Sequence, residues 1–270
     1  MRRFFLTLCL LTLASSSAKA QTPAPAPAPA PASEPPPAAP TSAPPAPSAI
    51  SILFTSDIYG RFAWPGCDSR PVKGRAGMAN LISTVRELKQ ARQAHGEPEP
   101  IVVSGGSMIR PDIMGNLMFA KGMPQAEAMV DLIKRVGFDA VAMGAFDFGA
   151  GPNALNRYME QMSAAKIPLL AANVTCDHAK DFRCNHLGQE GRRFVMINRG
   201  GLKVAIYSLS REDLPSRVIS KSRGSLKAAA PLDTARTLTR ELRGKHGADL
   251  VILLANLNVE GDTPGAVINF

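Results

Sequence analysis

The sequence predicts an α/β domain in which short strands alternate with amphipathic helices. Residues 76–94 and 124–136 repeat apolar side chains three and four positions apart, as helices with one buried face do. Apolar runs such as 101–103 and 249–255 lie next to these helices and are bounded by turn residues. Strands that alternate with helices form sheets covered by helices, so we expect strands that are buried on both faces.

The expected elements follow one another in a regular order. Strands are predicted at 50–54, 101–103, 138–143, 168–174 and 249–255, and a hairpin at 194–209. Helices are predicted at 76–94, 124–136, from Pro152 onward and at 232–246. Gly137 ends the second helix, Pro152 suits the first turn of the third, and Gly200-Gly201 forms the hairpin turn.

The first 20 residues have the composition of a secretory signal peptide. Arg2 and Arg3 precede an apolar run from Phe4 to Ala14, and Ala18-Lys19-Ala20 is a small-x-small cleavage site. The apolar run is shorter than the roughly 20 residues that a membrane-spanning helix needs. We therefore expect a periplasmic or secreted protein with no membrane span.

Residues 21–48 form a proline- and alanine-rich linker. Twelve of the 23 prolines lie between Pro23 and Pro47. Proline fixes φ and lacks a donor, so this segment is expected to be an extended polyproline II spacer. The remaining residues, 49–270, are enough for one domain with its own core.

The charge of the chain gives no sign of a nucleic-acid polymer as partner. Lys and Arg number 31 against 22 Asp and Glu, a formal net charge of +9. The basic residues are scattered along the chain, whereas nucleic-acid platforms gather them in stripes with aromatic residues.

Ligands of layered α/β domains bind at the carboxyl ends of the strands. The segments that follow the predicted strands are Asp57–Gly60, Gly105–Ser107, Gly144–Gly149, Ala172–Val174 and Ala255–Asn258. Ser104-Gly105-Gly106-Ser107 has two interpretations: an anion-binding nest of backbone N–H groups, or a turn that needs glycine only for its shape. No Gly-x-Ser-x-Gly elbow, P-loop or Gly-x-Gly-x-x-Gly motif occurs.

In this order and spacing, the segments resemble the calcineurin-like metallophosphoesterase superfamily, and in particular its exported 5′-nucleotidase branch. The resemblance covers residues 50–262. Supporting phrases are Gly77–Ala79, Gly137–Val141, Leu170–Val174, Gly201–Tyr207 and Ala248–Leu254. It implies a layered α-β-β-α sandwich that hydrolyses phosphate esters with two divalent metal ions, which lower the pKa of a bound water.

The sequence departs from the family pattern at most metal ligands. That pattern is Asp-x-His after the first strand, Gly-Asp after the second, Asn-His-Glu after the third, then a lone His and a final Gly-His-x-His. Asp57 matches the first metal ligand. Tyr59 stands where a histidine belongs, Ser107 where the bridging aspartate belongs, and Asn256 where the later histidine belongs.

The segment after the third predicted strand is shorter than in the family pattern. Gly144-Ala145 runs directly into Phe146-Asp147-Phe148-Gly149, so the ligand Asn and the catalytic His are absent. Asp147 matches the aspartate that supports this histidine in the family. The final Gly-His-x-His motif does not occur before Phe270, so we expect a sandwich that is incomplete at its C-terminus.

These substitutions predict a domain without a working di-metal centre. A serine hydroxyl does not supply the charge of a bridging carboxylate, and tyrosine is protonated near pH 7. Asparagine offers a carbonyl oxygen, which does not replace an imidazole. We therefore expect no cofactor, and a pseudoenzyme whose old cleft binds an unidentified ligand or protein partner. Asp57 and Asp147 would then act as local caps of backbone N–H groups.

Two further interpretations stay open. The domain could retain a reduced metal site, with Mn²⁺, Zn²⁺ or Mg²⁺, that still hydrolyses phosphate esters such as nucleotides. It could also be a poorly stable gene remnant that lacks its final strands.

Three cysteines follow the expected cleavage site: Cys67, Cys176 and Cys184. In an oxidising compartment Cys176 and Cys184 are expected to form a disulfide, which leaves Cys67 unpaired. The alternative is a zinc site made by the repeated Cys-x-His of Cys176-x-His178 and Cys184-x-His186.

Overall fold

The computed structural model describes residues 49–60, 77–109, 125–149, 152–177, 187, 192–218 and 223–257. The expected signal peptide, residues 1–20, and linker, residues 21–48, lie outside these ranges and stay predictions. No helix within the described ranges is both long and apolar enough to cross a membrane.

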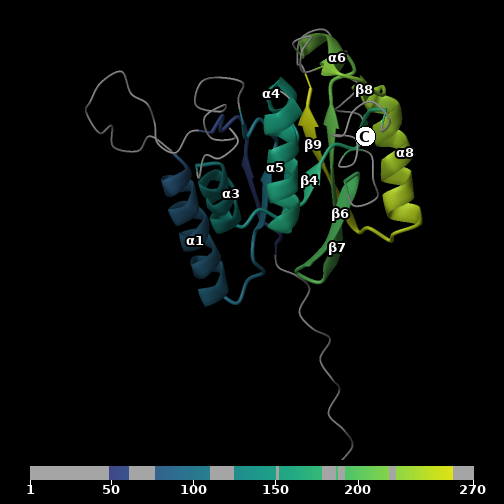
Figure 1. The fold of residues 1–270 in the computed structure, drawn as a ribbon. Coiled ribbons are helices and arrows are strands. Elements are labelled where there is room, and N and C mark those ends of the chain that lie inside the picture. The colour runs from purple at the N-terminus through teal and green to yellow at the C-terminus, as the bar shows by residue number, and fades with distance from the viewer. Residues whose placement is uncertain are drawn as a thin grey trace, which may run out of the picture. The chain divides into compact units, whose positions relative to one another are not determined.

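The chain folds into two sheets that pack face to face between helices. The first part contains β1 (Ile52–Thr55), α1 (Met78–Ala94), β2 (Ile101–Ser104), α3 (Gln125–Val136), β3 (Ala140–Ala142), α4 (Ala145–Gly149), α5 (Pro152–Ala164) and β4 (Leu169–Leu170). The second contains β5 (Val174–Thr175), β6 (Phe194–Arg199), β7 (Leu202–Ser210), α6 (Leu214–Arg217), β8 (Lys227–Ala228), α8 (Pro231–Gly244) and β9 (Leu250–Asn256). Figure 1 shows α1, α3 and α5 on one side of the sheets and α8 on the other.

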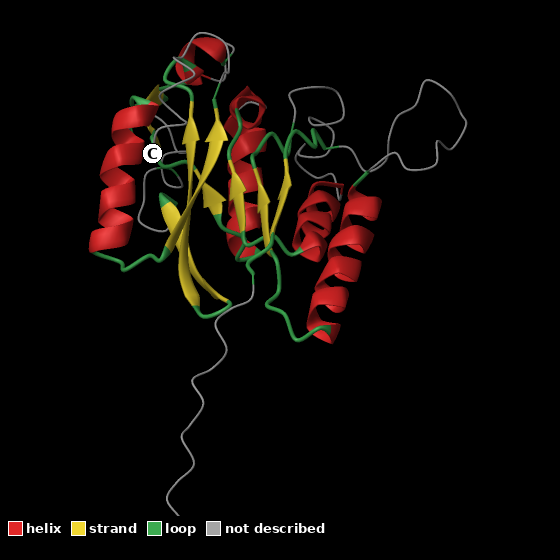
Figure 2. Ribbon diagram, turned by 180° about the vertical axis from the view of Figure 1, so that it is seen from behind, coloured by secondary structure: helices red, strands yellow, loops and turns green. Residues whose placement is uncertain are grey.

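The first sheet is parallel, in the order β1-β2-β3-β4. The second sheet has the order β6-β7-β9, in which β6 and β7 form the hairpin and β9 runs parallel to β7. A separate pair, β5 and β8, is antiparallel. Figure 2 shows the strands enclosed between the helices. This is the layered α-β-β-α arrangement that the sequence predicted.

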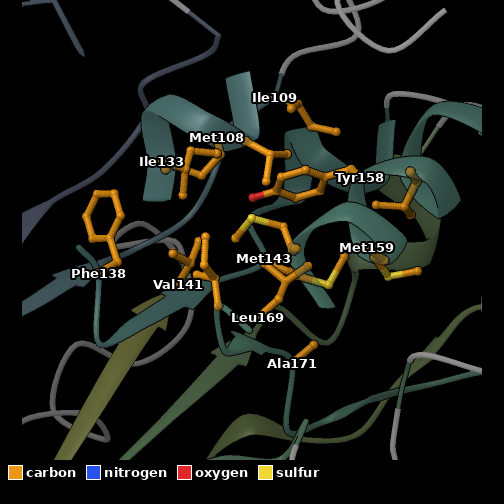
Figure 3. Packing of buried hydrophobic residues seen from close by; sticks show 14 of the residues in the cluster. Met108, Ile109, Ile133, Phe138, Val141, Met143, Tyr158, Met159, Leu169 and Ala171 are labelled. Atoms are coloured by element: carbon orange, nitrogen blue, oxygen red, sulfur yellow. The ribbon is translucent and has the colours of Figure 1, made fainter. Parts of the chain in front are cut away.

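Three apolar layers hold these elements together. The largest lies between the first sheet and helices α1, α3 and α5; Figure 3 shows part of it, including Tyr158 among Met108, Ile109 and Met143. The second lies between the two sheets, from Ile101, Val103, Ala140, Ala142, Leu170, Val204, Ile206 and Leu254. The third joins the second sheet to α8 through Ala205, Tyr207, Leu209, Ala235, Leu238 and Leu242.

The predicted strand over 168–174 was wrong as a single element. The chain forms β4 in the first sheet, turns at Asn173, and enters β5 in the small pair. The turn is held by the Asn173 amide, whose Nδ2 donates to the carbonyls of Ser210 (2.7 Å) and Ala229 (2.9 Å). Its Oδ1 accepts from the Ser210 N–H at 2.8 Å. These partners come from later elements, and so the local pattern did not reveal the break.

The expectation that the strands are buried on both faces holds for β2 and β3 but was wrong for β1. All four residues of β2 and all three of β3 are buried. In β1, Ile52 and Phe54 remain 46% and 64% exposed. The reason is position, because β1 is the edge strand of the first sheet and these two side chains point to the inner face.

Candidate functional site

The loops after β1 and β2 run side by side beyond the strands and bring three of the predicted site residues onto adjoining backbone. The N–H of Asp57 donates to the Gly106 carbonyl at 2.9 Å. The N–H of Tyr59 donates to the Ser107 carbonyl, also at 2.9 Å. Asp57, Tyr59 and Ser107 have φ values of 55°, 52° and 56°. Such values are uncommon outside glycine and cluster at functional sites.

Asp147 lies at the centre of these loops and is fully buried. Its Oδ2 accepts from the N–H groups of Ser107 (3.0 Å) and Gly144 (2.8 Å), and its Oδ1 from that of Ile109 (2.8 Å). One carboxylate therefore ties the loop after β2 to the start of α4. The sequence suggested two roles for Asp147: a vestigial one, as the support of a catalytic histidine that is lost, and the local capping of backbone N–H groups. The contacts are those of the capping role.

Burial shifts the acid–base behaviour of this carboxyl group. Desolvation raises the pKa of Asp147 from 3.8 to about 7, although the backbone N–H groups of Ile109, Gly144, Ser107 and Met108 act in the opposite direction. Tyr158, buried in the layer of Figure 3, has a pKa well above 10 because of its burial and, second, the charge of Asp147.

Ser107 is 1% exposed and lies close to the backbone of the neighbouring loop. A Cβ added to Gly144 would clash with the Oγ of Ser107, and a Cβ added to Gly106 would lie 2.6 Å from the Gly144 nitrogen. The two loops touch here without room for a larger group. Ser107, which the sequence predicts to stand in the place of a bridging ligand, faces Gly144 at close range.

The backbone N–H groups of the turn at residues 104–107 donate to acceptors within the protein. Gly105 donates its N–H to the Thr55 carbonyl (2.8 Å), Gly106 to Ser104 Oγ (3.3 Å), and Ser107 to Asp147. An anion nest needs N–H groups that point to a ligand. The structure therefore supports the plain glycine turn over the anion-binding nest.

Asn256, at the end of β9, connects the second sheet to the same loops. Its Oδ1 accepts from the Ala145 N–H at 3.2 Å, and its Nδ2 donates to the Gly105 carbonyl at 3.3 Å. Both Oδ1 and Nδ2 of the amide bind backbone groups, so Asn256 links β9 of the second sheet to the loops that follow the first sheet.

Two aromatic side chains meet at the strand-end site, which we define as Asp57, Tyr59, Ser107, Asp147 and Asn256. The rings of Tyr59 and Phe146 meet edge to face, with centroids 5.3 Å apart and planes at 89°. Phe146 keeps 44% of its surface exposed. No role was predicted for Phe146, although its place one residue before Asp147 in a strand-end segment was a usable signal.

Within the part of the chain that the structure describes, the donor set of the strand ends does not fit a two-metal centre. The structure contains no group of three or more His, Cys, Asp or Glu side chains that could hold a metal ion among its described residues. Asp147 is committed to N–H groups, which leaves Asp57, exposed and bonded to Ser56 Oγ at 3.1 Å. The described histidines, His95 and His246, precede strands and so lie at the opposite strand ends.

The cysteine prediction is tested only at one end. Cys176 is disulfide-bonded. Cys184 and Cys67 lie outside the described residues, so the pairing of Cys176 with Cys184 stays a prediction. A disulfide sulfur is not the thiolate that zinc requires, and the zinc alternative is therefore wrong for Cys176.

Comparison with known proteins extends these observations. No family model matches the chain. It is 26% identical to the 5′-nucleotidase of Vibrio vulnificus over 208 residues, which are 77% of this chain and 34% of that protein. It is 19% identical to an apyrase of Anopheles gambiae over 221 residues, 80% of this chain and 36% of that protein. The chain thus spans about a third of the length of these relatives.

Solved structures show the same fold. The calcineurin-like phosphoesterase YfkN of Bacillus subtilis superposes with a TM-score of 0.59 and 17% identity, covering 76% of this chain and 61% of that one. The 5′-nucleotidase precursor of Thermus thermophilus gives 0.56 and 18%, covering 77% and 37%.

The two sheets and the helices outside them have the fold of a calcineurin-like phosphoesterase. In sequence, the chain is similar to one part of 5′-nucleotidases and apyrases.

Proposed function

We propose that this domain is a non-catalytic member of its family, which binds a ligand or a protein partner at the strand-end site. The observation that carries the proposal is the use of the site's own polar groups. Asp147 accepts from backbone N–H groups of Ser107, Ile109 and Gly144, and Asn256 bridges Ala145 and Gly105. Groups that already complete each other's hydrogen bonds are not arranged to bind two dications.

The exposed part of the site that a ligand could contact is partly aromatic and partly charged. Phe146 stands against Tyr59 with much of its ring exposed, and Asp57 adds an exposed carboxylate. An aromatic surface with a polar group beside it is typical of binding sites in which the ring supplies area and the polar group supplies orientation. The identity of the ligand is not implied by these residues.

The second candidate function is a residual phosphate-ester hydrolase with a reduced metal site. It is favoured by Asp57, which matches the family's first ligand and whose carboxylate is exposed rather than tied into the loops. A single carboxylate is a weak site for Mn²⁺, Zn²⁺ or Mg²⁺, since such sites draw on several ligands. For that reason we rank this function second.

Metal binding and turnover separate the two functions. We expect the full chain, equilibrated with Mn²⁺ or Zn²⁺ and desalted, to retain no pair of metal ions and to hydrolyse AMP no faster than its Asp57→Ala variant. Elemental analysis and phosphate release measure the two quantities. Asp233→Ala, which removes a carboxylate that is 80% exposed on α8, serves as the matched control.

The opposite result is equally clear. Retention of one or two metal ions per chain, with AMP turnover that Asp57→Ala abolishes and Asp233→Ala preserves, would establish the hydrolase and end the non-catalytic proposal.

Export is part of the same proposal. Residues 1–20 have the three regions of a cleavable signal, and residues 21–48 would then separate the domain from the new N-terminus. Expression of the full chain in a Gram-negative host should yield a periplasmic protein that begins at Gln21. N-terminal sequencing checks this, and a cytoplasmic protein that keeps Arg2 and Arg3 would contradict it.

A further inference from the structure

The first sheet ends in a strand whose outer edge has no neighbouring strand within the described part of the chain. β1 is the end strand of its sheet, next to β2. The Ile101 N–H of β2 donates to the Ser51 carbonyl at 2.8 Å. Because backbone groups alternate in direction along a strand, the N–H and C=O groups of Ile52 and Phe54 point away from β2. We call these outward groups the β1 edge.

The β1 edge is accompanied by apolar side chains on the inner face of the sheet. Ile52 and Phe54 are paired in register with Ile101 and Val103, which are fully buried between the two sheets. Nevertheless, Ile52 keeps 46% of its surface exposed and Phe54 keeps 64%. Outward backbone groups therefore lie beside apolar area that is in contact with water, as at sites of β-strand addition.

Helix α1 contributes an uncharged strip on the outer face of the same edge. Arg92 reaches the start of β1, where it donates to Ser51 Oγ at 2.6 Å. Lys89 lies toward β2 and pairs with Glu99 at 3.8 Å. At 100° per residue, the next positions around the helix from Arg92, on the side away from Lys89, form an exposed stripe. We define this stripe as the α1 strip: Thr84, Leu88 and Ala91.

We propose that the β1 edge pairs with the β1 edge of a second copy of this chain. The two strands run antiparallel about a two-fold axis that passes beside Leu53. In this register, Ile52 of each copy stands opposite Phe54 of the other, and each such pair exchanges two N–H···O bonds. The first sheet then continues from one copy into the other.

The pattern of the surface favours a second copy over an unrelated strand. A two-fold axis sets identical patches against each other, so the patch has to complement itself. On the inner face Ile52 meets Phe54 of the other copy, a β-branched and an aromatic side chain, which pair well across strands. On the outer face the α1 strip meets its own counterpart. Its Leu88 is 39% exposed and has the small side chains of Thr84 and Ala91 beside it, so two helices can approach closely.

Charge also points to this edge. The chain carries a formal net charge of +9, so two copies repel each other over most orientations. Residues 50–56, Ile-Ser-Ile-Leu-Phe-Thr-Ser, contain no charged residue and no proline. Edge strands that remain single commonly carry a lysine, a proline or a bulge. The β1 edge has neither of the first two, and two copies can approach there without placing like charges at the axis.

The association of the full chain in solution tests the proposal. Because few residues form the contact, we expect a monomer at about 1 µM and a dimer at about 100 µM. Analytical ultracentrifugation over this range measures the mass. Phe54→Lys places a charge beside the axis and should raise the dissociation constant at least about tenfold. Thr237→Lys adds the same charge to an exposed position of α8, on the other side of the sheets (Figure 1), and should leave the constant unchanged.

Hydrogen exchange locates the contact within the dimer. The amides of Ile52 and Phe54 should exchange at least about tenfold more slowly at the high concentration than after dilution to the monomer. The Leu53 amide points to β2 and should keep the same protection at both concentrations, which shows that β1 stays in the sheet. In Phe54→Lys the concentration dependence at Ile52 should disappear, whereas Thr237→Lys should retain it.

Three results would overturn the proposal. The first is a chain that stays monomeric at every concentration. The second is a dimer in which the Ile52 and Phe54 amides exchange as fast as in the monomer, because the contact would then lie elsewhere. The third is protection of these amides that does not change on dilution, since their partner would then belong to the same chain. None of these measurements involves metal or ligand binding at the strand-end site, so they leave the proposed function untouched.

Discussion

Replacing Asp147 by alanine is expected to lower the free energy of unfolding by about 4 kcal/mol. The reason is that Ser107, Ile109 and Gly144 would each lose the acceptor of a buried N–H, at a cost of about 1–3 kcal/mol apiece, partly relieved by relaxation. For a domain of this size, the melting temperature should fall by about 10 °C. Thermal and urea unfolding of the full chain measure both quantities.

The control for this experiment is Asp233→Ala. Asp233 also lies in the first turn of a helix, but its side chain is 80% exposed, so its loss should cost less than about 1 kcal/mol. Equal melting temperatures for the two variants would show that the Asp147 carboxylate does not hold the loops together.

The same carboxyl group should make stability depend on pH. The pKa of Asp147 is raised to about 7 in the folded protein against 3.8 in the unfolded chain, so the unfolded state loses its proton first as the pH rises. The contribution of this group is complete below pH 4 and is lost between pH 4 and pH 7. Three pKa units correspond to at most about 4 kcal/mol.

Asp147→Asn isolates this dependence, because asparagine has a similar shape and does not titrate. The stability of the unmodified chain, minus that of the variant, should decrease from pH 4 to pH 7 and then level off. A difference that is constant, or that increases with pH, would mean that the backbone N–H groups outweigh burial and hold the pKa at or below 3.8.

Gly106→Ala is the second substitution with a large expected effect, a loss of about 3–5 kcal/mol. Gly106 has a φ of 101°, which costs an L-residue about 1–2 kcal/mol. In addition, the new Cβ would lie 2.6 Å from the Gly144 nitrogen and 2.8 Å from the Ala142 carbonyl oxygen. Since both contacts are backbone atoms, the loops after β2 and β3 would have to move apart.

Gly201→Ala separates the two contributions. Gly201 also has a positive φ, 81°, but its Cβ would meet nothing within 4 Å, so it should lose only about 1–2 kcal/mol. If unfolding experiments give the two variants the same stability, the close approach of Gly106 and Gly144 is not important for the fold.

Much of the fold could be predicted because its signals are local. The hairpin of β6 and β7 turns at Gly200-Gly201, as expected, because glycine supplies the positive φ of such a turn. The helices α1, α3 and α8 agree with the predicted ranges within two residues, since their apolar periodicity is carried by each segment alone. The short elements α4, α6 and β8 are too brief to show a period and were missed.

The sequence by itself determined the layered class and the family resemblance, and with that resemblance the prediction that Tyr59, Ser107 and Asn256 stand at ligand positions. Only the tertiary structure decided what Asp57 and Asp147 do. The donors to Asp147 include Ser107 and Ile109, 40 and 38 positions away, so its burial and its capping role arise from chain segments that meet only in the folded protein. Asp57 remains exposed because its loop lies at the edge of the first sheet, where fewer neighbours cover it. Residue types identify a chemistry, but the neighbours that compete for each carboxylate depend on contacts between distant parts of the chain.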